Sequence, residues 1–269
     1  MTMHRVIIFI TNIIIVFSAL AAAVEKHLLV SEGEIQINPK SVLHLPGIGL
    51  GLRCDNDSIM LLDDCDFMKL GFIEPNDARS FVKVRSGIYA AQGDSIYKMS
   101  TDKSTHAFIG RLDNEQFTLE RATDSTFYAN TADEKFSCVY EIFPETKECE
   151  PVISVEGPIL KIQSNGSNTV IWVDDTMMKL GNDNKLEPVF QADNITDMAV
   201  SPIGVLAGTT EGLYWLTGPN TGAKIVEEPI QAIWWDDSDI LYYLTQKGDL
   251  IAVIGLKSRF EEIINASSG

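Results

Sequence analysis

The chain repeats one short strand-like motif at intervals of about 37 residues. Near-copies of the motif are FMKL at Phe67, IYKM at Ile96, VYEI at Val139, MMKL at Met177, LYWL at Leu213 and LIAV at Leu250. Self-similarity at such a period is typical of repeat folds in which each repeat is one supersecondary unit. The spacing therefore indicates a solenoid or a propeller.

Each repeat contains three strong strands and a weaker fourth. In the clearest copy, which starts at Ile195, turn residues separate the strands ITDMAV, GVLAG, GLYWL and AKIVEE. Six such units, with almost no helical periodicity, predict an all-β fold, a six-bladed β-propeller of four-stranded blades. We place the first repeat from about Gly49. The preceding segment HLLVSEGEIQI is expected to pair with the last blade and close the ring, which would remove exposed strand edges.

Residues 1–23 have the layout of a secretory signal peptide. An apolar run from Val6 to Leu20 follows Arg5 and precedes three alanines that end at Ala23. We expect cleavage after Ala23, a single propeller domain over residues 24–269, and a secreted, extracellular protein. An uncleaved anchor is the alternative, because the apolar stretch to Val24 could just span a bilayer.

Sequons and cysteines agree with an oxidising compartment. Asn-x-Ser/Thr sequons, which predict glycosylation, occur at Asn56, Asn165, Asn194 and Asn265. Ten residues separate Cys54 from Cys65, and ten separate Cys138 from Cys149. Each spacing lies within one repeat, so we predict two local disulfides. Four buried thiols or a zinc site are the alternatives, although a zinc site would lack a C-x-x-C pair.

The formal charge of -17 disfavours binding to nucleic acid or anionic membranes. The sequence contains neither a nucleophile elbow nor a phosphate-binding loop, and its histidines lie in no recognisable triad context. We therefore predict no catalytic residue, no cofactor and no metal ligand. A binding protein is favoured over an enzyme, with a small molecule as its partner and a monomer as its expected state.

Cations gather on the predicted first strands, which in a propeller lie beside the central channel. Three of the six arginines that follow the signal, Arg53, Arg85 and Arg121, fall on these strands. The predicted ligand-binding residues are Arg53, Lys83, Arg85, Arg121, Lys161, Gln163, Asp197 and Trp234. Such a set suits an anionic or aromatic molecule through charged hydrogen bonds and stacking. Alternatively, the cations pair with Glu120, Asp197 and acids of adjacent blades and only neutralise the interior.

A second group of charged residues is acidic and lies in the turns between the second and third strands. It comprises Asp63, Asp64, Asp66, Asp94, Asp133, Glu134, Asp174, Asp175, Glu211 and Asp249. These turns would emerge on one face of the ring, which we name the acidic face. The face could bind calcium or a basic protein partner, but aspartate is also favoured in tight turns for its own hydrogen bonds.

The paired strands GIYAA and SIYKM, and later GVLAG and GLYWL, resemble blades of the propeller superfamily that includes regucalcin and gluconolactonases. They resemble more closely the secreted ommochrome-binding proteins of insect haemolymph. That resemblance implies a six-bladed secreted carrier of an anionic, tryptophan-derived pigment. The lactonase branch would instead imply a metal-dependent hydrolase with a Glu, an Asn and an Asp as ligands. Basic residues occupy several of the inner-strand positions, so no catalytic residue is carried over.

Overall fold

The computed structural model describes residues 25–30, 42–45, 49–53, 59–63, 66–69, 80–99, 107–112, 117–131, 135–218, 221–235 and 240–257. Up to residue 69 it describes strand backbones alone. The described strands, β1 to β24, form six four-stranded antiparallel sheets. Helical structure in these ranges is confined to a short stretch after β24, and none of it has the length and apolar character needed to cross a bilayer.

Five of the sheets contain four consecutive strands, and we name each after its first strand. The β2 sheet contains β2 (Val42–Leu45), β3 (Gly49–Arg53), β4 (Ile59–Asp63) and β5 (Asp66–Lys69). The β6 sheet contains β6 (Ser80–Val84), β7 (Gly87–Gln92), β8 (Ser95–Lys98) and β9 (Ala107–Arg111). The β10 sheet contains β10 (Phe117–Arg121), β11 (Phe127–Thr131), β12 (Phe136–Phe143) and β13 (Glu148–Glu156).

The β14 sheet contains β14 (Ile159–Ser164), β15 (Thr169–Val173), β16 (Thr176–Leu180) and β17 (Leu186–Gln191). The β18 sheet contains β18 (Ile195–Ser201), β19 (Gly204–Thr209), β20 (Gly212–Gly218) and β21 (Thr221–Val226). The β22 sheet differs, because β22 (Ile230–Trp235), β23 (Leu241–Thr245) and β24 (Leu250–Ile254) are completed by β1 (Glu25–Val30).

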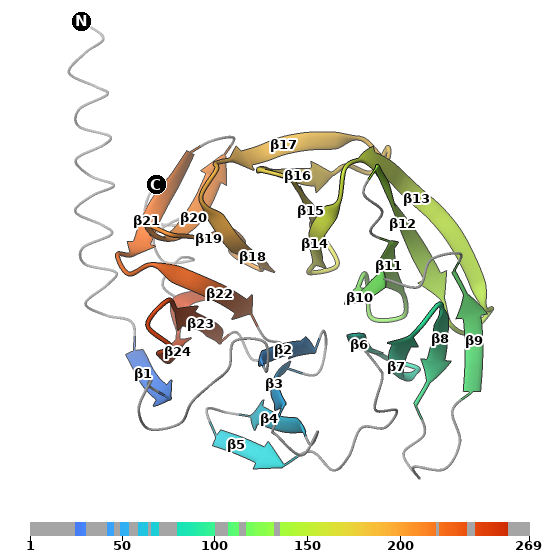
Figure 1. Ribbon diagram of the computed structural model, residues 1–269, viewed down its shortest axis with the longest axis horizontal. Coiled ribbons are helices and arrows are strands. Elements are labelled where there is room, and N and C mark those ends of the chain that lie inside the picture. The colour runs from blue at the N-terminus through green and yellow to red at the C-terminus, as the bar shows by residue number, and fades with distance from the viewer. Residues whose placement is uncertain are drawn as a thin grey trace, which may run out of the picture.

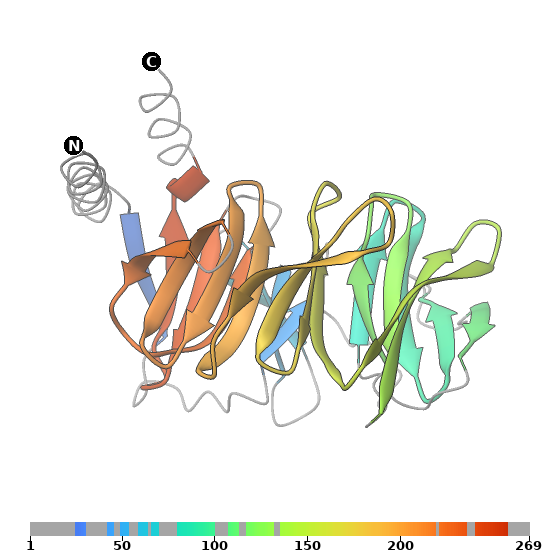
Figure 2. The same cartoon turned by 90° about the horizontal axis from the view of Figure 1, so that it is seen from above.

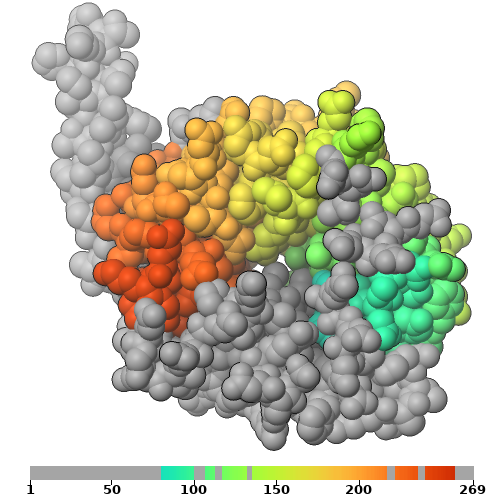
Figure 3. Space-filling model, in the orientation of Figure 1, coloured from blue at the N-terminus to red at the C-terminus, as the bar shows by residue number. Residues whose placement is uncertain are grey.

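The sheets are arranged around a common centre, with the first strands β10, β14 and β18 near it and β13 and β17 at the periphery (Figure 1). Viewed at right angles, the strands run across the thickness of the molecule (Figure 2). In the space-filling view the described sheets curve around the centre of this face (Figure 3). Side chains on a first strand can therefore reach the first strands of both neighbouring sheets.

The core lies between the facing surfaces of adjacent sheets. Between the β6 and β10 sheets, the rings of Tyr89 and Phe127 lie 5.1 Å apart, and both are almost fully buried. Burying such a side chain contributes about 1.5–3 kcal/mol. Strands between two packed faces have little need of polar positions, so β23 (LYYLT) is buried along its whole length. Aromatic and β-branched residues suit such strands, which explains the strength of the repeated motif.

The structure corrects the predicted start of the first repeat. The innermost strand of that sheet is β2, which begins at Val42, and Gly49 begins the second strand. Arg53 therefore ends β3 and does not lie on an inner strand, as the sequence analysis had placed it. The misplacement arose because VLHL, with four residues, is the shortest of the six first strands that the structure describes.

The predicted pairing of the N-terminal segment with the last sheet is confirmed for β1. Glu25 lies opposite Ile254 and Val30 opposite Leu250, in antiparallel register with β24. β1 thus takes the fourth position in the β22 sheet. Residues 1–24 lie outside the described residues.

Candidate functional site

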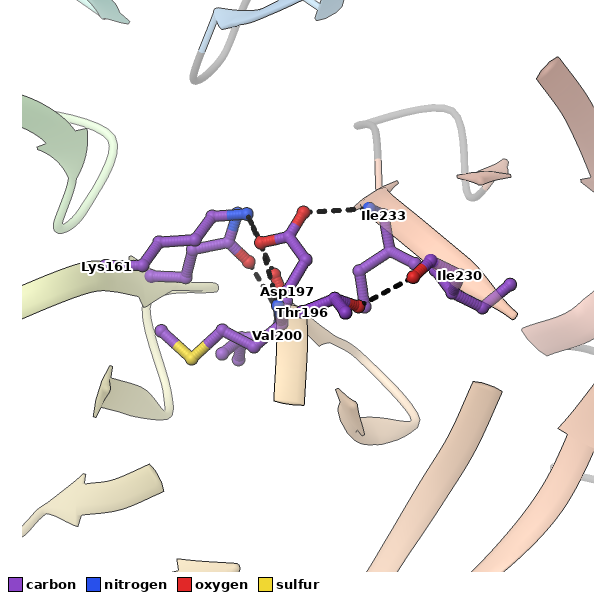
Figure 4. A network of polar contacts seen from close by, with 8 residues as sticks. Lys161, Thr196, Asp197, Val200, Ile230 and Ile233 are labelled. Carbon is purple, nitrogen blue, oxygen red and sulfur yellow. Dashed lines mark hydrogen bonds and ion pairs between the residues drawn. The ribbon is translucent and has the colours of Figure 1, made fainter. Parts of the chain in front are cut away.

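A chain of polar contacts joins three neighbouring first strands, β14, β18 and β22 (Figure 4). Lys161 Nζ lies 2.6 Å from Asp197 Oδ1 and donates a second hydrogen bond to the carbonyl oxygen of Met198, at 3.0 Å. Asp197 Oδ2 accepts a hydrogen bond from the backbone N–H of Ile233, at 2.8 Å. One carboxylate therefore connects three sheets.

The position of the first strand in each sheet explains these contacts. A first strand pairs with one neighbour only, so its other edge presents backbone N–H groups that need acceptors. Gln163 Oε1 accepts from the N–H of Val200, at 3.0 Å, in the same way that Asp197 accepts from Ile233. Gln163 and Asp197, which we predicted to bind ligand, are thus hydrogen-bonded to the backbone of the next sheet.

Glu120 is a buried carboxyl group that belongs to the same inner region. It lies on β10 and is 7% exposed. Burial raises the pKa of Glu120 to about 8, although the positive charges of Lys161 and Arg121 act in the opposite direction. Glu120 is therefore largely protonated near neutral pH. The sequence suggested it only as an ion-pair partner for the cations.

The predicted basic residues lie at two different distances from the hairpin turns that end their strands. Lys83 is one pair from the end of the β6–β7 hairpin, Arg85 lies in its turn, and Arg121 is in the last pair of the β10–β11 hairpin. Lys161 lies opposite Trp172, three pairs before the end of its own hairpin. Lys83 thus lies two residues of strand nearer its hairpin end than Lys161 does, about 7 Å. The alignment that set Lys83 level with Lys161 is therefore wrong in register.

The two ends of this predicted site also differ in exposure. Lys83 and Arg85 are exposed, whereas Lys161 is partly buried and ion-paired. Trp234 is 5% exposed and packs in an apolar cluster with Tyr242, Leu244 and Leu250. The structure thus joins Lys161 to Asp197 and places Gln163 on the same strand as Lys161, whereas the exposed Lys83 and Arg85 lie at a hairpin end and Trp234 lies in an apolar cluster.

An open pocket of about 500 Å³ lies at the opposite end of the first strands, lined by Thr196, Gln231 and Gln246. Thr196 and Gln231 are each the second residue of a first strand, β18 and β22, and Gln246 follows β23. The sheet register is irregular at both positions, between Ile195 and Asp197 and between Ile230 and Ala232. Such irregularities redirect side chains, and they are frequent beside binding sites.

This pocket was not predicted from the sequence. Thr196 and Gln231 occupy equivalent positions of consecutive repeats, and that equivalence was the only sequence signal available. An irregular register cannot be read from polar residues alone, because their pattern is compatible with a regular strand. The pocket lining among the described residues is polar and uncharged, so it offers hydrogen-bond donors and acceptors without an ion.

The predicted Cys138–Cys149 disulfide is not formed in the structure. Both thiols are free, and Cys138 lies opposite Ser154 whereas Cys149 lies opposite Ile142. Four residues along β12 separate the two positions, about 13 Å of strand, which exceeds the reach of a disulfide. The equal spacing of the cysteines was misleading because the β12–β13 hairpin turns at residues 144–147, nearer to Cys149 than to Cys138. Cys54 and Cys65 lie outside the described residues.

The turns that make up the acidic face follow the predicted order where they are described. Asp94 lies between β7 and β8, Asp174 and Asp175 between β15 and β16, and Glu211 between β19 and β20. Asp94 is ion-paired with Arg111, and Asp175 accepts hydrogen bonds from Thr176 and Gln191. Within the described part of the chain, no three His, Cys, Asp or Glu side chains are grouped closely enough to hold a metal ion.

Comparison with known proteins assigns the fold. No protein-family model and no curated protein matches the chain. Among solved structures, a candidate gluconolactonase is similar with a TM-score of 0.56 at 10% identity, over 86% of this chain and 92% of that one. Streptogramin B lyase is similar with a TM-score of 0.53 at 13% identity, over 80% of each chain.

The extracellular domain of the one-component system BT4673 from B. thetaiotaomicron is also similar, with a TM-score of 0.53 at 14% identity. That match covers 75% of this chain but 32% of the other, so the chain spans about a third of that domain. At these identities the likeness concerns the fold. Together with the ring of antiparallel sheets, it defines the chain as a β-propeller.

Proposed function

We propose that the chain is a secreted six-bladed β-propeller, closed by β1, that binds a small molecule at the centre of the ring. The observation that carries this proposal is the pocket formed by Thr196, Gln231 and Gln246. Its volume, about 500 Å³, falls in the range of small-molecule sites. The pairing of β1 with β24 and the six four-stranded sheets of the described strands support the closed ring.

The pocket's side chains are suited to polar groups of a ligand. The carboxamides of Gln231 and Gln246 have no hydrogen bond to other described residues, so each can both donate to and accept from a ligand. The Thr196 hydroxyl donates to the carbonyl oxygen of Ile230, at 2.9 Å, and keeps its capacity to accept. An anionic or aromatic cargo such as an ommochrome-type pigment, with further polar groups, is the ligand that the sequence suggests.

The position of Lys161 limits how such a cargo could bind. Its ammonium group already contacts Asp197 and Met198, so an anion there would have to displace these partners. We therefore propose that the ligand's polar groups occupy the pocket, and that Lys83, Arg85 and Arg121, at the other end of the first strands, attract an anionic ligand at long range without contacting it in the pocket.

The proposed secretion is supported mainly by the sequence. The signal-like residues 1–23 and the four sequons suggest it, and the likeness to an extracellular domain of BT4673 agrees with it. Secretion of the full chain by eukaryotic cells, with Edman sequencing of the mature N-terminus, tests it. The proposal predicts a chain that starts at Val24.

Ligand binding is tested by native mass spectrometry and an absorbance spectrum of the full chain purified from the fluid into which it is secreted. A bound small molecule is expected, and the variant Gln231→Ala/Gln246→Ala should release it. Lys247→Ala provides the control, because Lys247 is exposed in the same β23–β24 turn but does not line the pocket. Equal retention of the molecule by all three proteins would refute the pocket as the site.

A metal-dependent hydrolase of the lactonase type is the second candidate, suggested by the likeness to the candidate gluconolactonase. Calorimetric titration of the full chain with calcium and with zinc separates the two functions. Heat that saturates at one metal ion per chain would favour the hydrolase, and its absence would favour the carrier. A scaffold that binds a basic protein through the acidic face would instead show strongly salt-dependent binding of that protein.

A further inference from the structure

Two of the four sequons fall in the described residues, and the structure places their asparagines in different surroundings. Asn165 lies in the turn between β14 and β15, and Asn194 immediately precedes β18. Asn56 and Asn265 lie outside the described residues. A sequon alone marks a potential acceptor, so the surroundings of each asparagine decide which site the folded protein tolerates.

The Asn165 side chain is part of a contact between sheets. Its Nδ2 donates a hydrogen bond to the carbonyl oxygen of Ser201, at 2.9 Å, and Ser201 is completely buried at the end of β18. Its Oδ1 accepts from the backbone N–H groups of Ser167 and Asn168, at 3.0 and 2.9 Å. Both ends of the carboxamide are therefore engaged, and the atom that would carry a sugar contacts the neighbouring sheet.

Asn194 has no comparable role. Its backbone carbonyl accepts a hydrogen bond from the N–H of Thr210, at 3.1 Å, which fixes the main chain. Its half-buried side chain makes no hydrogen bond to the residues that the structure describes. A substituent on Nδ2 would therefore leave the described contacts between sheets intact. The third residue of this sequon, Thr196, lines the pocket.

We infer that Asn194 carries an N-linked glycan beside the Thr196–Gln231–Gln246 pocket, and that Asn165 carries none. In this reaction Nδ2 bonds to the anomeric carbon of a lipid pyrophosphate-linked oligosaccharide. The carbon–oxygen bond to the pyrophosphate breaks, and Nδ2 loses one proton. The inference depends on the secretory location in the proposed function. A glycan on Asn165 would exclude the Asn165–Ser201 contact when the sheets pack, so molecules that fold and are exported should lack it.

The test is site-resolved occupancy in the full chain secreted by insect cells. Peptide N-glycosidase in H₂¹⁸O converts a glycosylated Asn to ¹⁸O-labelled Asp, which peptide mass spectrometry locates. Label at Asn194 and none at Asn165 is the expected result. Label at Asn165, or none at Asn194, would overturn the inference.

Two variants test the occupancy of Asn194 and Asn165 by intact mass, which does not require that the peptides containing them are recovered. Asn194→Gln should lower the intact mass by one glycan. Ser167→Ala removes the sequon of Asn165 but keeps its side chain and the exposed turn, so the intact mass should not fall by a glycan. A loss of one glycan mass in Ser167→Ala would contradict the inference. Ligand retention measured on the same samples tests the proposed binding function separately, because occupancy does not depend on ligand.

Discussion

Lys161 and Asp197 form an ion pair across two sheets, with 2.6 Å between Nζ and Oδ1, and they are 36 residues apart in the sequence. That separation is one repeat. Each residue is also the first paired residue after the irregularity of its own first strand, opposite Trp172 and Gly208 respectively. Equivalent positions of consecutive repeats thus carry opposite charges, and the repeat that builds the ring also joins its neighbouring sheets.

Replacing Lys161 with Met should destabilise the protein by about 2 kcal/mol, because Asp197 would keep its backbone partners but lose a charged hydrogen bond in a partly buried site. Urea unfolding followed by tryptophan fluorescence measures the change. Lys179→Met is the matched control, since Lys179 is exposed on β16, and it should change stability by less than about 0.5 kcal/mol. Equal effects of the two variants would show that the ion pair contributes nothing.

Glu120→Gln should remove a pH dependence of stability. The folded pKa of Glu120, about 8, exceeds its ordinary value of 4.5, so between these values the folded state holds a proton that the unfolded state has lost. Its contribution is fully present below pH 4.5 and is lost as the pH rises to about 8. One such proton changes the free energy of unfolding by up to about 1.4 kcal/mol per pH unit.

Urea titrations at pH 5, 6.5 and 8 would measure this effect. The wild-type protein should lose stability relative to Glu120→Gln at each step, whereas Glu145→Gln, altered in an exposed turn, should follow the wild type. Parallel curves for the wild type and Glu120→Gln would mean that the buried carboxyl does not titrate in this range.

The fold was more predictable than the site because the repeat carries redundant information. The strong strands recur in several copies, so β7, β8, β19 and β20 could be placed from the sequence with the turns between them. Prediction failed at the least repetitive strand, β2, and Arg53 was consequently assigned to an inner strand when it ends β3. The position of β1 was predictable from the principle that an exposed edge needs a partner.

The site depended on register, which a sequence specifies weakly when both strand faces are buried. Lys161 and Asp197 were recognised as equivalent because consecutive repeats align without gaps there. Lys83 was wrongly set level with Lys161, because the turns that follow β6 and β14 differ in length: Val84 pairs with Gly87, whereas Ser164 pairs with Thr169. The pocket depends on irregularities at Thr196 and Gln231, for which a single sequence offers no distinct pattern.

Gly212→Ala should be among the most damaging small substitutions in the chain. Gly212 has φ of +150°, and an added Cβ would lie 2.2 Å from the carbonyl oxygen of Val226, a backbone atom of the adjacent strand. Backbone strain and overpacking together should cost about 3 kcal/mol or more, measured by urea unfolding. Gly110→Ala, in β9 with open space around the new methyl group, should be close to neutral. Similar losses in both variants would indicate a general intolerance of alanine in strands.

Cys149→Ser should leave stability within about 0.5 kcal/mol of the wild type, because the structure gives Cys149 a free, exposed thiol. A native disulfide to Cys138 would make the same substitution cost about 2–5 kcal/mol. Peptide mapping without reduction, after blocking of free thiols with an alkylating agent, provides the direct measurement. Alkylation of both Cys138 and Cys149 is expected, with Cys149 reacting faster in the folded protein because Cys138 is less exposed and lies 3.5 Å from Ser154 Oγ. Recovery of a Cys138–Cys149 linked peptide would require β12 and β13 to pair about four residues out of the register found here.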